Sequence, residues 1–214
     1  MKLKKIASLA LAGVMAISML AGCSGKTGST EDNGSVVEAN NTSAVTAFNN
    51  NQDEDNDVKV VFSADSKLDD LVAQAVRVLG KDAEWSVGGP LNDIQDMIAK
   101  LTGKTSDTLF AEDTGNDDLA DGMTATAWYG MDLDSQTYWS ETDAVNAAAR
   151  EADAVIAKLP VNTKEGKKDG DTYYSYSYTG NVAVVAFQNL KGNTVYHVVY
   201  TITQTATKGT VTKG

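Results

Sequence analysis

The sequence predicts an α+β domain in which three helices pack on a largely antiparallel sheet that ends in a C-terminal three-stranded meander. The sheet is predicted by two dipeptides, Gly180-Asn181 and Gly192-Asn193. Each separates β-prone runs, and Gly-Asn suits a two-residue hairpin turn. The helices are predicted by three segments with apolar residues at helical spacing. The expected order of elements is β-α-α-β-α-β-β-β.

The first strand and the first two helices are expected between residues 58 and 103. Residues 58–62, Val-Lys-Val-Val-Phe, are typical of a short strand. A helix follows, with apolar residues at helical spacing from Leu68 to Leu79, Ser66 as its N-cap and Gly80 as its stop. A second helix opens at Pro90, a favoured first-turn residue, and ends at Gly103. The polar residues 104–122 are expected to form a loop.

Another strand is predicted over residues 123–133, and the third helix begins near Ser140 and ends before Pro160. Glu141 and Asp143 in its first turn and Lys158 in its last turn suit the helix dipole. Its alanines permit a close approach to a sheet. The residues expected to point inward are Val145, Ala148, Ala152, Val155, Ile156 and Leu159.

If both Gly-Asn dipeptides are two-residue turns, the register of the meander is fixed, because a one-residue slip would exchange its faces. One face then carries only apolar and aromatic residues, and we expect it to pack against the helices, including the alanine-rich one. The opposite face is mixed and is either covered as well or offers a contact surface. The rows of the apolar face are Tyr174/Phe187/Val198, Tyr176/Val185/Tyr200 and Tyr178/Ala183/Ile202, and the central strand of the mixed face carries Val182, Val184 and Ala186.

The N-terminal residues have the layout of an exported signal segment. Three lysines within residues 2–5 precede an uncharged apolar run over residues 6–20, which is short for a membrane-spanning helix of about 20 residues. The run ends in Leu20-Ala21-Gly22-Cys23, which resembles the lipobox of bacterial lipoproteins. The resemblance covers residues 1–23 only. It implies that residues 1–22 are a signal peptide and that Cys23 is the site of lipid (palmitate-type) attachment.

Composition then predicts how the exported chain is organised. Residues 23–57 are rich in small polar and acidic residues and cannot bury enough apolar surface to offset chain entropy, so they are expected to form a disordered, lipid-anchored tether. Residues 58–205 would form a single α+β domain, and residues 206–214 a flexible tail. The lipid anchor implies an extracytoplasmic location at the cell surface, on the cell membrane or the outer membrane of a bacterium.

The charge of the chain excludes one class of partner. Removing residues 1–22 removes three lysines and no acidic residue, so 15 basic and 29 acidic residues remain and the formal charge changes from −11 to −14. Such a chain repels nucleic acid. A membrane bound through the anchor, and an unknown protein, peptide or glycan ligand, remain as partners. Cys23 is the single cysteine, so no disulfide forms within the chain.

No catalytic or cofactor-binding residue can be assigned. His197 is the single histidine, and the expected register places it beside Tyr173 and Gln188 on the mixed face, exposed to solvent. A catalytic triad would need Ser175 or Ser177 nearby, and the chain has no Gly-x-Ser-x-Gly nucleophile elbow. One histidine and no second cysteine cannot form a typical zinc site.

The strongest metal candidate is the acidic segment 113–121. Calcium requires several oxygen ligands from one loop, and this segment supplies them. It departs from the EF-hand pattern, because Gly115 is at its third position and Thr124 stands where the bidentate glutamate belongs. We therefore expect a solvated loop and assign no metal, with a calcium-stabilised domain as the alternative.

Tryptophan and carboxylate residues suggest two functions. Trp85, Trp128 and Trp139 are candidate stacking platforms for sugars, although strand aromatics are usually core residues. Nothing in the spacing of the candidate glycosidase carboxylates Asp93, Asp96 and Glu141 indicates that two of them meet across a cleft. The sequence therefore favours a non-enzymatic binding or interaction domain over a small carbohydrate- or peptidoglycan-directed hydrolase.

Overall fold

The computed structural model describes residues 37–38, 41–79, 90–115, 118–134, 140–163, 172–188 and 194–210. All of them belong to one compact unit, Asp32–Gly214. The unit has the predicted α+β class. Its helices are α1 (Asn41–Asn50), α2 (Ser66–Leu79), α3 (Pro90–Thr102) and α4 (Glu141–Ile156), and its strands are β1 (Val37–Glu38), β2 (Val61–Ser63), β3 (Thr124–Asp134), β4 (Thr172–Gln188) and β5 (Thr194–Thr210).

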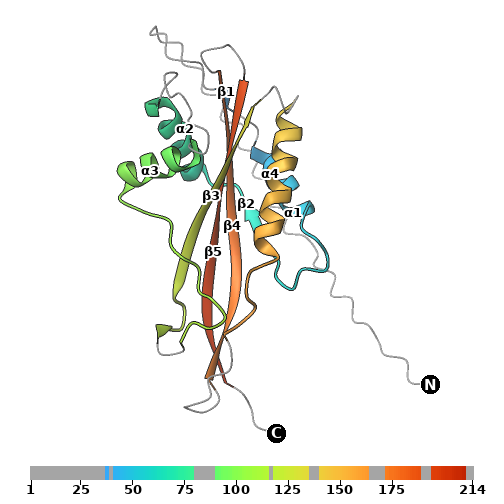
Figure 1. Ribbon diagram of the computed structural model, residues 1–214, viewed down its shortest axis with the longest axis vertical. Coiled ribbons are helices and arrows are strands. Elements are labelled where there is room, and N and C mark those ends of the chain that lie inside the picture. The colour runs from blue at the N-terminus through green and yellow to red at the C-terminus, as the bar shows by residue number, and fades with distance from the viewer. Residues whose placement is uncertain are drawn as a thin grey trace, which may run out of the picture. The chain divides into compact units, whose positions relative to one another are not determined.

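The five strands form one sheet in the order β1-β4-β5-β3, and β2 also pairs with β4. All pairings are antiparallel except that of β2 with β4. The two 17-residue strands β4 and β5 run through the middle of the sheet and pair along their whole length. Helices cover both faces, with α2 and α3 on one side and α1 and α4 on the other (Figure 1).

The predicted turn at Gly180-Asn181 is wrong, because both residues lie inside the continuous strand β4. The predicted two-residue turn at Gly192-Asn193 lies outside the described residues, but its register is also wrong. Gln188, rather than Lys191, is opposite Thr194, so residues 189–193 connect β4 to β5. The C-terminal region therefore contributes two long strands, and β3 supplies the next strand beyond β5.

Gly180 is required by a close approach rather than by a turn. A Cβ atom built at Gly180 would lie 2.5 Å from the Cε1 atom of Phe62 and 3.0 Å from the carbonyl oxygen of Thr201. Gly209 has the same role in β5, where a Cβ would lie 2.6 Å from the Cζ atom of Tyr173. Glycine at these strand positions makes room for an aromatic ring on the sheet.

The continuous strand also changes which residues share a face. Side chains alternate along a strand, so Tyr174, Tyr176, Tyr178, Val182 and Val184 all lie on one face. This aromatic face packs against α1 and α4, which confirms the expected contact with the alanine-rich helix. Val182 and Val184 were expected on the opposite face. Ala183 and Val185 occupy that face instead and pack against α2 and α3.

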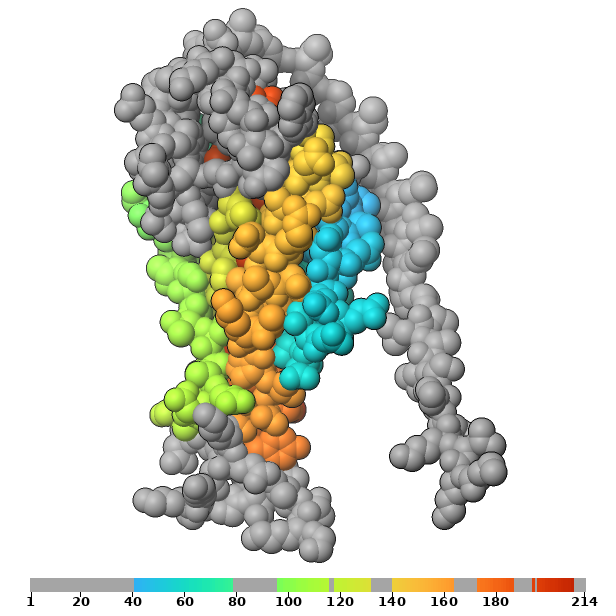
Figure 2. Space-filling model, turned by 45° about the vertical axis from the view of Figure 1, so that its right-hand side comes forward, coloured from blue at the N-terminus to red at the C-terminus, as the bar shows by residue number. Residues whose placement is uncertain are grey.

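Helix α1 corrects the later part of the predicted tether over residues 23–57, of which residues 23–36 lie outside the described residues. Its side chains Ala44 and Phe48 are 0% and 1% exposed, so the folded domain includes this helix. The ring of Phe48 meets those of Phe62 and Tyr200 edge to face, with centroids 5.0 and 5.2 Å away. In the space-filling view α1 lies beside α4 (Figure 2).

Side-chain amides attach α1 and the turn after it to the next segment of chain. The Asn49 amide donates to the carbonyl of Phe62 at 3.0 Å and accepts from its N–H at 2.9 Å. The Gln52 amide makes the same pair of bonds with Val60, at 2.6 and 2.9 Å. These amides pair with the extended chain as a neighbouring strand would. The strand predicted over residues 58–62 therefore lies later in the chain, as β2 (Val61–Ser63), and the backbone of Val60 is bonded to the Gln52 side chain instead.

The predicted ends at Ser140 and Gly103 agree closely with the structure, whereas Gly80, the predicted stop of α2, lies outside the described residues. Ser140 caps α4 and accepts a hydrogen bond from the N–H of Asp143, and Gly103 ends α3 with a φ of 69°. At α2 the cap is one residue earlier than predicted, because Asp65 rather than Ser66 accepts from the N–H of Lys67 at 2.9 Å. The predicted flexible tail at 206–214 is corrected over residues 206–210, since β5 continues to Thr210, and residues 211–214 lie outside the described residues.

The amide pairs predict a specific loss of stability. Asn49→Ala and Gln52→Ala should each lower the free energy of unfolding by about 1–3 kcal/mol, because partly buried backbone groups lose their partners. Asn50→Ala removes an exposed amide from the same helix and should change it by less than about 0.5 kcal/mol. Urea unfolding of the three variants measures this difference. Equal effects at positions 49 and 50 would contradict the role of the amide pair.

Gly180→Ala should lower the free energy of unfolding by about 1–3 kcal/mol, because the added methyl group overlaps the ring of Phe62. In a Phe62→Leu background the same change should be less costly, since the smaller side chain can move away. Thr179→Ala, at the exposed neighbouring position in β4, is the matched control. A double-mutant cycle in urea gives the coupling between positions 62 and 180, and a coupling of zero would disprove the close-approach explanation.

Candidate ligand-binding pocket

Several residues singled out in the sequence lie outside the described part of the chain. They are Cys23 with the whole lipobox, Trp85 and Trp139. Of the carboxylates weighed as a glycosidase pair, Asp96 lies on α3 and Glu141 begins α4, and the backbone of Asp93 is also on α3. These two helices lie on opposite faces of the sheet. The structure therefore does not bring the α3 carboxylates together with Glu141.

His197 is buried, at 1% exposure, which corrects the prediction of a solvent-facing residue. In the observed register it lies opposite Val185 of β4 and Asp132 of β3. Ser177 is eight residues from Val185 along β4, which corresponds to roughly 26 Å. Neither Ser177 nor the more distant Ser175 can form a triad with this histidine.

The segment between α3 and β3 is tied to the sheet by tyrosine hydroxyls. Tyr176 donates to the carbonyl of Ala111 at 3.1 Å, and Tyr174 donates to that of Leu119 at 3.0 Å. Asp121 accepts from the N–H of Lys208 at 2.9 Å. Within the described residues, which omit 116–117, no three His, Cys, Asp or Glu side chains gather as a metal site would require.

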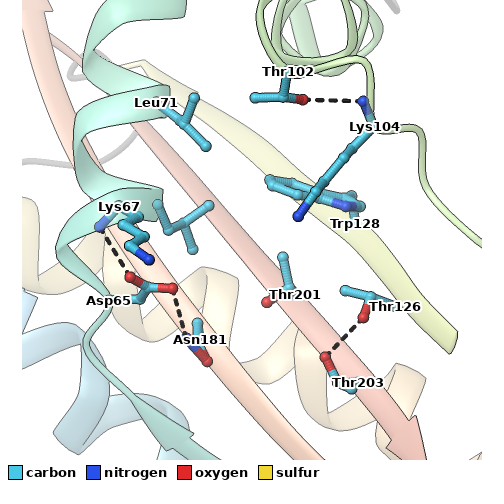
Figure 3. Close-up of a pocket in the computed structure, with 11 residues that line it drawn as sticks. Asp65, Lys67, Leu71, Thr102, Lys104, Thr126, Trp128, Asn181, Thr201 and Thr203 are labelled. Atoms are coloured by element: carbon cyan, nitrogen blue, oxygen red, sulfur yellow. Dashed lines mark hydrogen bonds between the residues drawn. The ribbon is translucent and has the colours of Figure 1, made fainter. Parts of the chain in front are cut away.

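A pocket of mixed chemistry lies beside α2 and α3, on the face of the sheet that these helices cover (Figure 3). We call it the Trp128 pocket. Its volume is about 280 Å³, close to the lower limit of roughly 300 Å³ for small-molecule pockets. Asp65, Lys67 and Leu71 line it from the start of α2, and Lys104 lines it from the segment after α3.

The other walls of the Trp128 pocket are strand residues. The half-exposed Trp128 comes from β3, Thr201 from β5 and Asn181 from β4. They form one row across the sheet, because Thr201 is the pairing partner of both Trp128 and Asn181. An aromatic ring, a hydroxyl and an amide therefore lie side by side on one face of the sheet.

Charge in the Trp128 pocket is unevenly distributed. The Asp65 carboxylate accepts from the N–H of Lys67 at 2.9 Å and from the Asn181 amide at 3.4 Å. The helix N-terminus and these donors stabilise its negative charge. The exposed side chains of Lys67 and Lys104 add two positive charges to the same pocket. A strongly acidic chain thus has a small site where positive charge exceeds negative charge.

A polar face of the sheet continues from the Trp128 pocket. Next to the row Trp128/Thr201/Asn181, on the same face, β3, β5 and β4 contribute two further rows of hydroxyl residues. All six residues are partly or fully exposed. We call these six residues the hydroxyl face. Two positions along a strand span about 6.7 Å and neighbouring strands lie about 4.8 Å apart, so the hydroxyls form a regular array. The rows are Thr126/Thr203/Thr179 and Thr124/Thr205/Ser177.

Sequence reasoning found Trp128 but not its surroundings. Lys67, Lys104 and Asn181 come from three separate elements, and nothing local in the sequence brings them together. The available signal was the alternation of threonine at positions 201, 203, 205 and 207, which places their side chains on one face of β5. The wrong turn at Gly180-Asn181 concealed its partner row in β4.

Comparison with protein-family models, with curated proteins and with solved structures found no match to this chain. Among the helices that the structure describes, none combines the length and apolar character that a membrane span needs.

The tyrosines of the aromatic face belong to the core and are not binding platforms. Tyr178 and Tyr200 are 6% and 3% exposed, and Tyr200 stacks on Tyr129 with ring centroids 4.9 Å apart. Burial raises the pKa of both Tyr178 and Tyr200 well above the ordinary value near 10. Folding therefore opposes ionisation of these phenols.

This shift predicts a loss of stability in alkali. A raised folded-state pKa contributes stability that is fully present below pH 10 and is lost as the pH rises further, because only the unfolded chain ionises readily. The free energy of unfolding should fall above pH 10 by about 1.4 kcal/mol per pH unit for each such phenol. Tyr200→Phe should make the decline shallower in urea unfolding at pH 9–11. An unchanged slope would show that Tyr200 does not contribute.

Proposed function

We propose that this chain is a lipid-anchored, extracytoplasmic lipoprotein whose folded domain is a non-enzymatic binding module, with the Trp128 pocket as its ligand site. The anchor is inferred from residues 20–23, Leu-Ala-Gly-Cys, after a charged start and an apolar run. The binding role is inferred from one observation: aromatic, hydroxyl, amide and ammonium groups converge in a pocket on a rigid sheet. Such a mixture of apolar and polar groups is characteristic of small-molecule sites.

The geometry favours binding over hydrolysis. A carboxylate-based glycosidase needs two carboxyl groups about 5–10 Å apart across a cleft. The Trp128 pocket has a single lining carboxylate, Asp65, which is already engaged by two hydrogen-bond donors. A larger hollow of about 490 Å³, between segment 106–111 and the residues after α4, also has one, Asp107. Neither pocket contains the acid–base pair that the alternative requires.

The position of β1 limits how far the domain can lie from a membrane. Residues 24–36 separate Cys23 from Val37, the first residue of β1. At no more than about 3.6 Å per residue, this connection spans at most about 50 Å. In the proposed arrangement the domain stays within the layer immediately outside the bilayer, where envelope and surface ligands are found.

Replacing Cys23 tests the anchor. Cys23→Ser removes the thiol to which the lipid is attached, so the protein should move from the membrane pellet to the soluble extracytoplasmic fraction and should no longer incorporate labelled palmitate. Ser24→Ala, beside the same predicted cleavage site, is the matched control and should remain in the pellet. Cell fractionation with an antibody against the folded domain measures both. Membrane retention of Cys23→Ser would overturn the anchor.

A further inference from the structure

The Trp128 pocket and the hydroxyl face together have the features of a polysaccharide-binding surface. Resting on the proposed binding function, we propose that they bind a saccharide chain that carries carboxylate groups. One sugar ring would lie against Trp128, its carboxylate would face Lys67 and Lys104, and the following sugars would lie along the hydroxyl face.

The aromatic residue and its row account for recognition of one ring. Trp128 is partly buried against the apolar cluster of α2 and α3 and lines a pocket of about 280 Å³, a size suited to a single ring rather than a large ligand. The apolar face of a sugar packs on an indole, while its hydroxyl groups need donors and acceptors nearby. Asn181 and Thr201 supply these in the same row of the sheet.

The lysines account for the preference for a charged sugar. The mature chain has a formal charge of −14, so most of its surface repels anions. In the pocket, Lys67 and Lys104 face a single carboxylate, Asp65, which is held by the N–H of Lys67 and the Asn181 amide. A ligand carboxylate is therefore attracted here, and the attraction should weaken with salt.

The hydroxyl face suits an extended saccharide better than a bound peptide. A peptide commonly binds a sheet by pairing with the backbone of an edge strand. Here the surface is the face of three paired strands, and at the outer edge of β3 the backbone groups of Thr126 and the N–H of Trp128 are bonded to Asp107 and Ser106, so at these rows side chains rather than backbone groups are offered. Their hydroxyls form a flat, regular array. The Thr126 and Thr203 hydroxyls also bond to each other at 2.9 Å, which fixes their positions.

Affinity electrophoresis of the detergent-solubilised wild-type protein tests the inference. Native gels would contain either polygalacturonate, a polymer of carboxylate-bearing sugars, or a neutral galactan of similar mass. The protein should be retarded by polygalacturonate and much less by galactan, and 0.5 M salt should reduce the retardation severalfold. Equal retardation by both polymers would overturn the role of the carboxylate, and no retardation by either would overturn saccharide binding altogether.

Variants assign the binding to the pocket. Trp128→Ala and Lys104→Glu should each raise the dissociation constant by about tenfold. Trp128→Phe keeps a ring, so its dissociation constant should stay within about threefold of the wild-type value. Arg150→Glu makes the same charge change at an exposed residue of α4, on the opposite face of the sheet, and should leave affinity unchanged. Lys104 is exposed, so its variant keeps the test valid if Trp128→Ala fails to fold. Wild-type affinity in Lys104→Glu would place the site elsewhere.

The two proposals fail in different ways. If Cys23→Ser is released from membranes but the wild-type protein binds neither polymer, the anchor is retained and the saccharide inference is rejected. If the protein binds polygalacturonate but Cys23→Ser stays in the membrane pellet, the saccharide inference is retained and the proposed anchor is rejected.

Discussion

The fold depends on side-chain amides that pair with backbone groups where no strand is available. Asn49 and Gln52 bind the chain that leads into β2, and Asn41 accepts from the N–H of Val184 at 3.0 Å, beside β1 at the edge of β4. The fully buried Gln204 does the same for Phe110, accepting from its N–H at 2.6 Å and donating to its carbonyl at 3.1 Å. Since an unpaired buried backbone group is costly, these amides permit irregular segments to lie against a closed core.

The amide pairs contribute to a difference in how far helices cover the two faces of the sheet. With α1 held in place, Phe48 reaches Phe62 and Tyr200, and the alanines of α4 approach the same face closely, so the aromatic face is covered. On the other face α2 and α3 pack on the half that contains Ala183, Val185 and Val199. The half that carries the hydroxyl face stays accessible, and the Trp128 pocket lies at the boundary between the two halves.

The sequence correctly predicted the elements whose ends are marked by residues close to them in the chain. The prediction failed where one residue type has two possible structural roles. Ser140 as a cap and Gly103 as a stop act within a few residues, so α4 and α3 were located closely. Gly180 was interpreted as a turn, because glycine marks turns and close approaches alike, and only the distant ring of Phe62 distinguishes them. Residues 41–57 were interpreted as a tether, because composition treats asparagine and glutamine as solvated, whereas here they replace a strand.

The candidate site was harder to predict for a related reason. Trp128 and the alternating threonines were visible in the sequence, yet a pocket requires knowing which residues share a row, and that depends on the register of β4 against β5. The observed pairing of β4 with β5 differs from the expected pairing by three residues. His197 therefore lies opposite Val185 rather than the expected Gln188, and Asn181 lies opposite Thr201. The register is in turn constrained at Gly180, where Phe62 occupies the space of a side chain. A packing requirement on the aromatic face thus determines which polar groups meet on the opposite face.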